Sequence, residues 1–260
     1  MGSGSGAAAG TESAGRTLDV LLRFLDGTET LGISELARDM TVSKAVVHRA
    51  LQTLAGRDMV EFDEATRRYR LGPAAAALGV RALRDSDLRS AARSHLADLQ
   101  LTTGETVTLS GLLRGGRVYL DQIVSAHEIA MSVEMGRRFP LHAGSSGKCI
   151  LAHLPADQLD RLLAEPLEQL TAKTVVRPDV LRAELSEIND AGYASSDGER
   201  QADAGSVAAA VFGFDGVPVG AISVCGPRSR VTPEFVRRVA PQVVEAARDI
   251  STSLGHRGRP

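Results

Sequence analysis

The sequence has no tryptophan, and aromatic residues make up only 3% of its 260 residues. Two cysteines are too few for the disulfide framework of a small secreted protein. No apolar run reaches the roughly 18 residues that cross a bilayer, and the first ten residues lack the regions of a signal peptide. The sequence therefore predicts a soluble, cytoplasmic protein without membrane contact.

The sequence also lacks a large excess of positive or negative charge. Lys and Arg number 30, and Asp and Glu number 32, which gives a net charge of −2. This balance excludes a uniformly basic nucleic-acid coat, although it leaves room for a local basic patch. The apolar fraction of 43% is that of an ordinary globular protein, and the length predicts one or two domains.

Composition and periodicity divide the chain into five parts. A Gly-, Ser- and Ala-rich lead, predicted to be disordered, covers residues 1–15, and a compact domain follows over 16–73. Residues 74–103 are rich in Ala, Leu and Arg, which favours a connecting helix. The second domain covers 104–254, and a tail covers 255–260.

The third predicted helix of the first domain has two distinct sides. Ser43 is its expected N-cap. A buried stripe is predicted from the spacing i, i+3, i+4, i+7, occupied by Val47, Ala50, Leu51 and Leu54. The other side carries polar and small residues, namely Lys44, Ala45, His48 and Arg49.

A two-stranded hairpin is predicted after this helix, with arginines at 67, 68 and 70. Three short helices followed by a basic hairpin is the order of a winged helix-turn-helix, whose third helix enters the major groove of DNA. Residues 16–73 hold nine basic and nine acidic side chains, so DNA affinity requires their segregation. The predicted DNA contacts are Ser43, Lys44, Ala45, His48, Arg49, Arg67, Arg68 and Arg70. The alternative is another small α+β domain with solvated charges.

From Thr106 onward the period of the pattern changes to two. A hairpin is predicted around Arg114-Gly-Gly-Arg117, a further strand over 129–136, and two strands around the turn at Asp215-Gly216. Helical segments lie between and after these strands. The pattern predicts an α+β domain built around an antiparallel sheet.

Four motifs in fixed order make the chain similar to the IclR family of transcriptional regulators. They are ISELARDMTVSKAVVHRALQTL, TGETVTLSGLLRGGRVYLDQI, PLHAGSSGKCILAHL and DGVPVGAISVCGP, and the resemblance covers residues 16–254. It implies a winged helix-turn-helix domain and a GAF-like effector-binding domain. It also implies homodimers or tetramers that bind double-stranded operator DNA. Two departures, DGER at 197–200 and AAAV at 208–211, flank the expected pocket.

A ligand site is predicted at Gly144–Gly147. A helix that starts with Gly and Ser offers free backbone N–H groups and hydroxyls, from Ser145 and Ser146, which suit a small carboxylate. The alternative is ordinary capping by a serine. The family resemblance adds Asp197, Ser206, Ala208, Ser223 and Cys225 as pocket residues, with Met131 as an apolar wall.

Catalysis and metal binding have weak support. Cys149 and His153 share a helix face, with His142 nearby in sequence, but no CxxC, HExxH or acidic partner accompanies them. No nucleotide-binding glycine motif is present. We therefore predict no catalytic residue, no metal and no cofactor.

These patterns together predict a ligand-responsive DNA-binding regulator, a repressor rather than an activator. One rival is a small-molecule sensor whose N-terminal domain binds protein, and a weaker rival is a Cys/His metal-dependent protein. Steep salt dependence distinguishes DNA binding from the first, and metal analysis tests the second.

Overall fold

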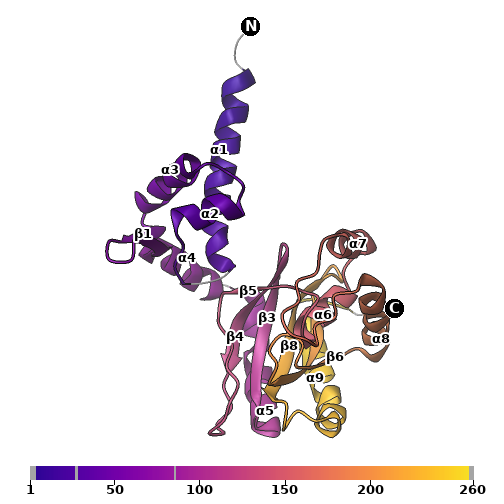
Figure 1. Ribbon diagram of the computed structural model, residues 1–260. Coiled ribbons are helices and arrows are strands. Elements are labelled where there is room, and N and C mark those ends of the chain that lie inside the picture. Colours follow the sequence, from indigo (N-terminus) through magenta and orange to yellow (C-terminus); the bar gives the residue numbers. More distant parts are fainter. Residues whose placement is uncertain (1–3, 27–28, 85, 258–260) are drawn as a thin grey trace. The chain divides into compact units, whose positions relative to one another are not determined.

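The computed structural model describes residues 4–26, 29–84 and 86–257 (Figure 1). The chain forms two compact units, residues 1–85 and residues 86–260. The first unit consists of α1 (Gly4–Leu22), a short 3-10 helix η1 (Arg23–Leu25), α2 (Ile33–Asp39), α3 (Lys44–Ala55), β1 (Val60–Asp63), β2 (Arg68–Leu71) and α4 (Pro73–Arg84). This is the predicted helix-turn-helix followed by a hairpin.

The expectation of a disordered lead over residues 1–15 is wrong from residue 4 onward. The first helix begins at Gly4, and residues 1–3 lie outside the described residues. Alanine is the strongest helix former, so the run at residues 7–9 favours the extension.

The core of the first unit confirms the predicted stripe on α3. Val47, Ala50, Leu51 and Leu54 are all buried, and they pack with side chains of the neighbouring helices and the hairpin. Ser43 is the N-cap, and its Oγ accepts a hydrogen bond from Val46 N at 3.4 Å. Because the stripe fixes the rotation of α3, its opposite side faces solvent.

The hairpin β1–β2 forms the wing. Val60 pairs with Leu71 and Asp63 with Arg68 in antiparallel register. Tyr69 is buried and forms a further bridge with Leu31, with N–H to O distances of 2.9 Å in both directions. The wing is therefore joined to the segment before α2.

The predicted connecting region, residues 74–103, contains two helices rather than one. The first is α4 of the first unit, and the second is α5 (Asp87–Thr103) of the second unit. Ala92, Leu96 and Leu99 on α5 are buried in the core of the second unit. The domain boundary consequently lies at residues 85 and 86 and not at 103 and 104.

The second unit continues after α5 with strands and helices in alternating groups. These are β3 (Thr106–Leu113), β4 (Gly116–Ile123), β5 (Arg138–Phe139), α6 (Ser145–Ala152), α7 (Ala156–Ala164), α8 (Pro178–Ala191), β6 (Ala194–Asp197), β7 (Ala204–Phe212), β8 (Pro218–Pro227) and α9 (Pro233–Ser253). The strands form one antiparallel sheet in the order β5-β4-β3-β8-β7-β6 (Figure 1).

Helices cover both faces of this sheet. On one face α5 and α9 pack against inward residues such as Val207 of β7. On the other face α6 and α8 pack against the alternate residues, such as Ala208. Because side chains alternate along a strand, small and polar residues of β3, β7 and β8 lie together on the α6 side.

The strand predicted over residues 129–136 is absent. Side chains, not a strand ladder, hold this segment beside the sheet. Gln122 Nε2 donates to Val133 O at 3.0 Å, and Gln122 Oε1 accepts from Val133 N at 2.9 Å. Thr106 Oγ1 donates to Met131 O at 2.6 Å. An amide side chain thus takes the place of a neighbouring strand.

Candidate DNA-binding surface and ligand pocket

The outward side of α3 brings the predicted helix residues together. Lys44, Ala45, His48 and Arg49 are all exposed, and Ser43 lies at the start of the same surface. Among the described residues, neither Lys44 nor Arg49 forms an ion pair. Two uncommitted cations on an exposed helix can contact phosphates or guanine edges.

The three wing arginines have different environments. Arg67 is exposed at the turn with a φ of 58°, and its guanidinium lies 5.4 Å from the Phe62 ring centroid. Arg70 is exposed and donates to Glu61 Oε2 across the strand pair, at 2.7 and 3.0 Å. Arg67 also forms an ion pair with Glu64, but at 3.7 Å and fully at the surface, so it is better placed to reach a phosphate than Arg70, whose partner Glu61 lies at 2.7 Å.

Arg68, also one of the predicted DNA contacts, has a structural role in the first unit. Its guanidinium donates to Thr30 Oγ1 at 2.9 Å, to Thr30 O at 2.8 Å and to Glu35 Oε2 at 2.7 Å. These bonds join β2 to the segment before α2 and to α2 itself. Sequence alternation could not reveal this role, because both partners lie more than thirty positions away.

A small cavity of about 30 Å³ lies between α6 and the sheet in the second unit. Six of the predicted pocket residues line it, namely Met131, Ser145, Ser146, Ser206, Ser223 and Cys225. A volume of this size holds one or two water molecules. A larger ligand therefore requires a side chain to move.

Close packing positions the start of α6 at this cavity. A Cβ on Gly147 would lie 2.6 Å from Leu141 O, so only glycine fits there. Ser145 Oγ is 2.7 Å from Ser206 Oγ on β7, which ties the helix to the sheet. The first N–H groups of a helix have no partner within the helix, so this end can bind an anion.

Two predicted pocket residues lie elsewhere. Asp197 is exposed and forms ion pairs with Lys173 and Arg228, and these hydrogen bonds lower the pKa of its carboxyl to about 2. Ala208 is fully buried in the core under α6, where its carbonyl accepts from Cys149 Sγ at 2.9 Å. Neither residue lines the small cavity.

The cavity also contains a buried cation that the sequence did not reveal. Arg117 on β4 is only 1% exposed, and it donates to Ser110 Oγ at 3.0 Å and to Tyr119 OH at 3.1 Å. Its Nε has no hydrogen-bond partner. Among the described residues no carboxylate pairs with it.

A second arginine, Arg200, lines the same cavity from the loop after β6 and is partly buried. Its guanidinium carbon lies 4.9 Å from the Phe139 ring centroid and 5.8 Å from that of Tyr119. Alternation along β4 could have predicted that Arg117 faces this pocket. Arg117 and Tyr119 are two residues apart, and they therefore share a face of the strand.

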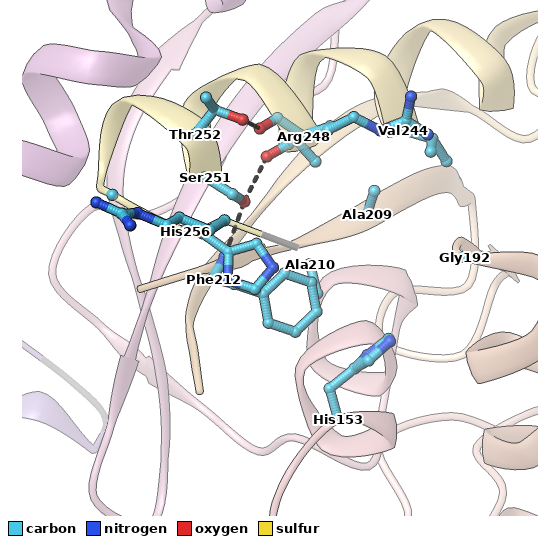
Figure 2. Close-up of a pocket in the computed structure, with 13 residues that line it drawn as sticks. His153, Gly192, Ala209, Ala210, Phe212, Val244, Arg248, Ser251, Thr252 and His256 are labelled. Atoms are coloured by element: carbon cyan, nitrogen blue, oxygen red, sulfur yellow. Dashed lines mark hydrogen bonds between the residues drawn. The ribbon is translucent and has the colours of Figure 1, made fainter. Parts of the chain in front are cut away.

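A larger cavity of about 700 Å³ lies near the end of α9 (Figure 2). His153 and His256 flank the Phe212 ring there, with centroids 5.0 and 5.3 Å from it. Among the polar groups of this cavity, Ser251 Oγ accepts from Phe212 N and donates to Ala247 O.

The Cys/His arrangement does not form a reactive site. Burial raises the pKa of the Cys149 thiol to about 12, so the thiol stays protonated near neutral pH. His153 Nδ1 bonds Cys149 O at 2.8 Å, which fits helix packing. In the part of the chain that the structure describes, His, Cys, Asp and Glu form no group able to hold a metal.

Among residues 4–26, 29–84 and 86–257, no helix has both the length and the apolar composition of a membrane span. An N-terminal helix-turn-helix with a wing, followed by a sheet that encloses a cationic pocket, defines a ligand-binding transcriptional regulator. The IclR helix-turn-helix domain matches residues 13–64, and the C-terminal domain of the bacterial transcriptional regulator IclR matches residues 80–252. The chain belongs to the IclR family of transcriptional regulators, whose members are not enzymes.

Similar proteins cover nearly the whole chain. The HTH-type transcriptional regulator BhcR of Paracoccus denitrificans is 35% identical over 95% of this chain and 91% of its own. A crystal structure of an IclR-type regulator from Silicibacter sp. TM1040 has a TM-score of 0.84 and 32% identity, covering 95% of this chain and 98% of that one. An IclR homolog from Microbacterium hydrocarbonoxydans, crystallised with 4-hydroxybenzoate, has a TM-score of 0.70 and 28% identity, covering 93% and 98%.

Proposed function

We propose that this protein is a repressor that releases or binds operator DNA in response to a small organic anion. The observation that carries the proposal is Arg117. A buried guanidinium without a carboxylate partner is costly, and it is retained most simply to bind an anion from solution. The similar protein from Microbacterium hydrocarbonoxydans was crystallised with a carboxylate, which supports the same ligand class.

The DNA half of the proposal rests on the outward side of α3. Lys44 and Arg49 are the cations for the major groove, with Ser43, Ala45 and His48 beside them, and Arg67 of the wing contacts a phosphate. This activity places the protein in the cytoplasm, where bacterial DNA lies. We propose repression because a regulator bound at a promoter blocks RNA polymerase unless the regulator also contacts the polymerase.

A homodimer is the proposed DNA-binding form. Helix-turn-helix regulators read two half-sites through two-fold symmetry. In the first unit, α1 and α4 leave apolar side chains in solvent: Leu18 is 58% exposed, Leu78 is 60% exposed and Val80 is 70% exposed. Because residues 78 and 80 are two apart on a helix, they lie on different sides of it, and each exposed apolar side chain is a separate candidate for the contact with a second subunit. Light scattering measures the mass of the assembly and distinguishes this dimer from the tetramer that the family resemblance implies.

Fluorescence anisotropy with the DNA upstream of the protein's own gene tests the proposal. Against a scrambled duplex, we expect selective binding that weakens steeply between two salt concentrations, because phosphate contacts release counterions. Adding a series of carboxylates then changes the anisotropy, and Arg117→Met removes that response. Selective, salt-sensitive binding with no carboxylate response would overturn the ligand class but not the DNA activity.

Arg49→Ala identifies the recognition surface in the same assay. We expect it to weaken operator binding by about 1–3 kcal/mol while the melting temperature stays unchanged. Arg161→Ala is the matched control, since it removes an exposed guanidinium from α7 in the second unit. Equal affinities of the two variants would remove Arg49 from the interface, and binding insensitive to salt would favour a protein partner.

A further inference from the structure

Two arginines in the small cavity stack on the same pair of aromatic rings. The guanidinium carbon of Arg117 lies 4.5 Å from the Tyr119 ring centroid and 5.5 Å from that of Phe139. For Arg200 the corresponding distances are 5.8 and 4.9 Å. The rings themselves meet edge to face at 5.4 Å. Both cations are therefore held close together at one end of the cavity.

The acidic side chains nearest to these arginines are already bound elsewhere. Glu199 accepts from Lys148 Nζ at 2.5 Å and from Gly144 N at 3.3 Å. Glu105 forms an ion pair with Arg230. Among the described residues that line the cavity, none is Asp or Glu. The described lining of the cavity thus carries two positive charges and no carboxylate.

The balance of charge distinguishes between ligands. A single carboxylate neutralises one guanidinium and leaves the second near it in a poorly solvated place, where like charges repel more strongly than in water. A ligand with two carboxylates neutralises both. Stacking on aromatic rings makes a guanidinium tolerable in the absence of ligand, which explains how the empty pocket keeps both arginines.

The remaining lining suits a short, polar ligand. Hydroxyls of Ser146, Ser196 and Ser223 face the cavity, with Met131 and Val133 as its apolar part. The current volume of about 30 Å³ is too small for such a ligand. Arg200 is the side chain that can move, because it contacts the two rings and forms no hydrogen bond with the residues that the structure describes.

The backbone that carries Arg200 is fixed. Thr174 Oγ1 donates to Glu199 O at 2.6 Å, and Thr171 Oγ1 donates to Gly198 O at 2.7 Å. The side chain can therefore leave the rings without a rearrangement of the loop.

We propose that the pocket selects a small dicarboxylate, with Arg117 binding one carboxylate and Arg200 binding the other. This inference rests on the proposed function, because it specifies the anion that the same site takes. Arg200 is then a specificity-determining residue, and it occupies the ligand's place until the ligand arrives.

Isothermal titration calorimetry with matched ligands tests the inference. Each straight-chain diacid from succinate to adipate is compared with its own half-amide at constant ionic strength, so that size and shape are nearly equal. For the best diacid we expect at least tenfold tighter binding than for its half-amide. In Arg200→Met the two ligands should bind within twofold of each other, and in Arg117→Met neither should bind.

Arg137→Met is the matched control. Arg137 also stacks on the Phe139 ring, at 5.3 Å, but it pairs with Glu134 and does not line the cavity. The preference for the diacid should survive in this variant. Arg200→Gln provides a second test if Arg200→Met folds poorly, which circular dichroism reports.

The outcomes distinguish a failure of the dicarboxylate inference from a failure of the proposed function. Equal binding of diacid and half-amide by the unmodified protein, with loss of both in Arg117→Met, overturns the dicarboxylate inference and leaves the proposed function standing. Absence of binding for every diacid, half-amide and simple monocarboxylate overturns both. A diacid preference that persists in Arg200→Met assigns the second charge to a different residue and contradicts the role given to Arg200.

Discussion

Replacing Arg117 by methionine should increase the stability of the protein while abolishing its response to anions. Methionine has similar length, is apolar and fits irregular space. Moving an isolated cation out of water costs several kcal/mol even after relaxation. The two hydrogen bonds to Ser110 and Tyr119 return about 1.5–3 kcal/mol each, and stacking on the Tyr119 ring adds to them, which leaves the guanidinium near balance.

The variant gains apolar burial and loses the desolvation cost. Ser110 and Tyr119 are direct cross-strand partners, so their hydroxyls can bond each other or water once the guanidinium is gone. Replacement of buried ions by well-packed apolar side chains is neutral or stabilising by about 1–4 kcal/mol. We expect a gain of about 1 kcal/mol for Arg117→Met, which corresponds to about 2–4 °C in Tm for a domain of this size.

Thermal unfolding in a buffer free of carboxylates and phosphate measures this gain. Addition of a bound anion at about a hundred times its Kd should stabilise the unmodified protein by about 2.7 kcal/mol and leave the variant unchanged. The order of stability therefore inverts when the ligand is added. A variant less stable by about 2 kcal/mol or more without ligand would show that Arg117 is a satisfied structural group, and the functional argument would fail.

Three further predictions concern other parts of the chain. Arg68→Ala should lower the stability of the first unit by about 1–3 kcal/mol, because it removes a part-buried charged hydrogen-bond set, whereas Arg67→Ala should leave urea unfolding unchanged and reduce the salt slope of operator binding by about one. Val80→Glu should shift the mass in light scattering toward the monomer and weaken operator binding; an unchanged mass would place the dimer contact elsewhere. Burial raises the pKa of the Cys149 and Cys225 thiols from 9.0 to about 12. The folded state therefore holds these protons more tightly than the unfolded state. The stability that the two thiols contribute is present below pH 9 and falls as pH rises from 9 to 12. Urea unfolding at pH 8 and pH 10.5 measures the difference, and a Cys149→Ala variant that keeps the full difference would contradict the assignment.

Local periodicity determined much of the first unit. The stripe from Val47 to Leu54 predicts which side of α3 is buried, and the opposite side carries Lys44 and Arg49 as a consequence. Ser43 as N-cap follows from the same local pattern. These features depend on residues within one or two helical turns of each other, and sequence alone contains that information.

The same reasoning placed part of the pocket. A Gly- and Ser-rich helix start at residues 144–147 predicted Ser145 and Ser146, and the resemblance to the IclR family implied the other four lining residues, Met131, Ser206, Ser223 and Cys225. The boundary between the domains was wrong, because α5 is amphipathic like any surface helix. Only its packing against the sheet assigns it to the second unit.

Whether a charged side chain is free or committed could not be predicted from sequence. Arg68 is bound by residues of the segment before α2 and of α2, Asp197 is neutralised by Arg228 beyond β8, and Arg117 has no carboxylate near it among the described residues. Each outcome depends on which distant segments the fold brings within about 4 Å, the range in which an ion pair forms. The sequence by itself determined most of the elements, the buried side of α3 and the family. The tertiary structure alone decided which arginines are structural and which remain available for a ligand or DNA.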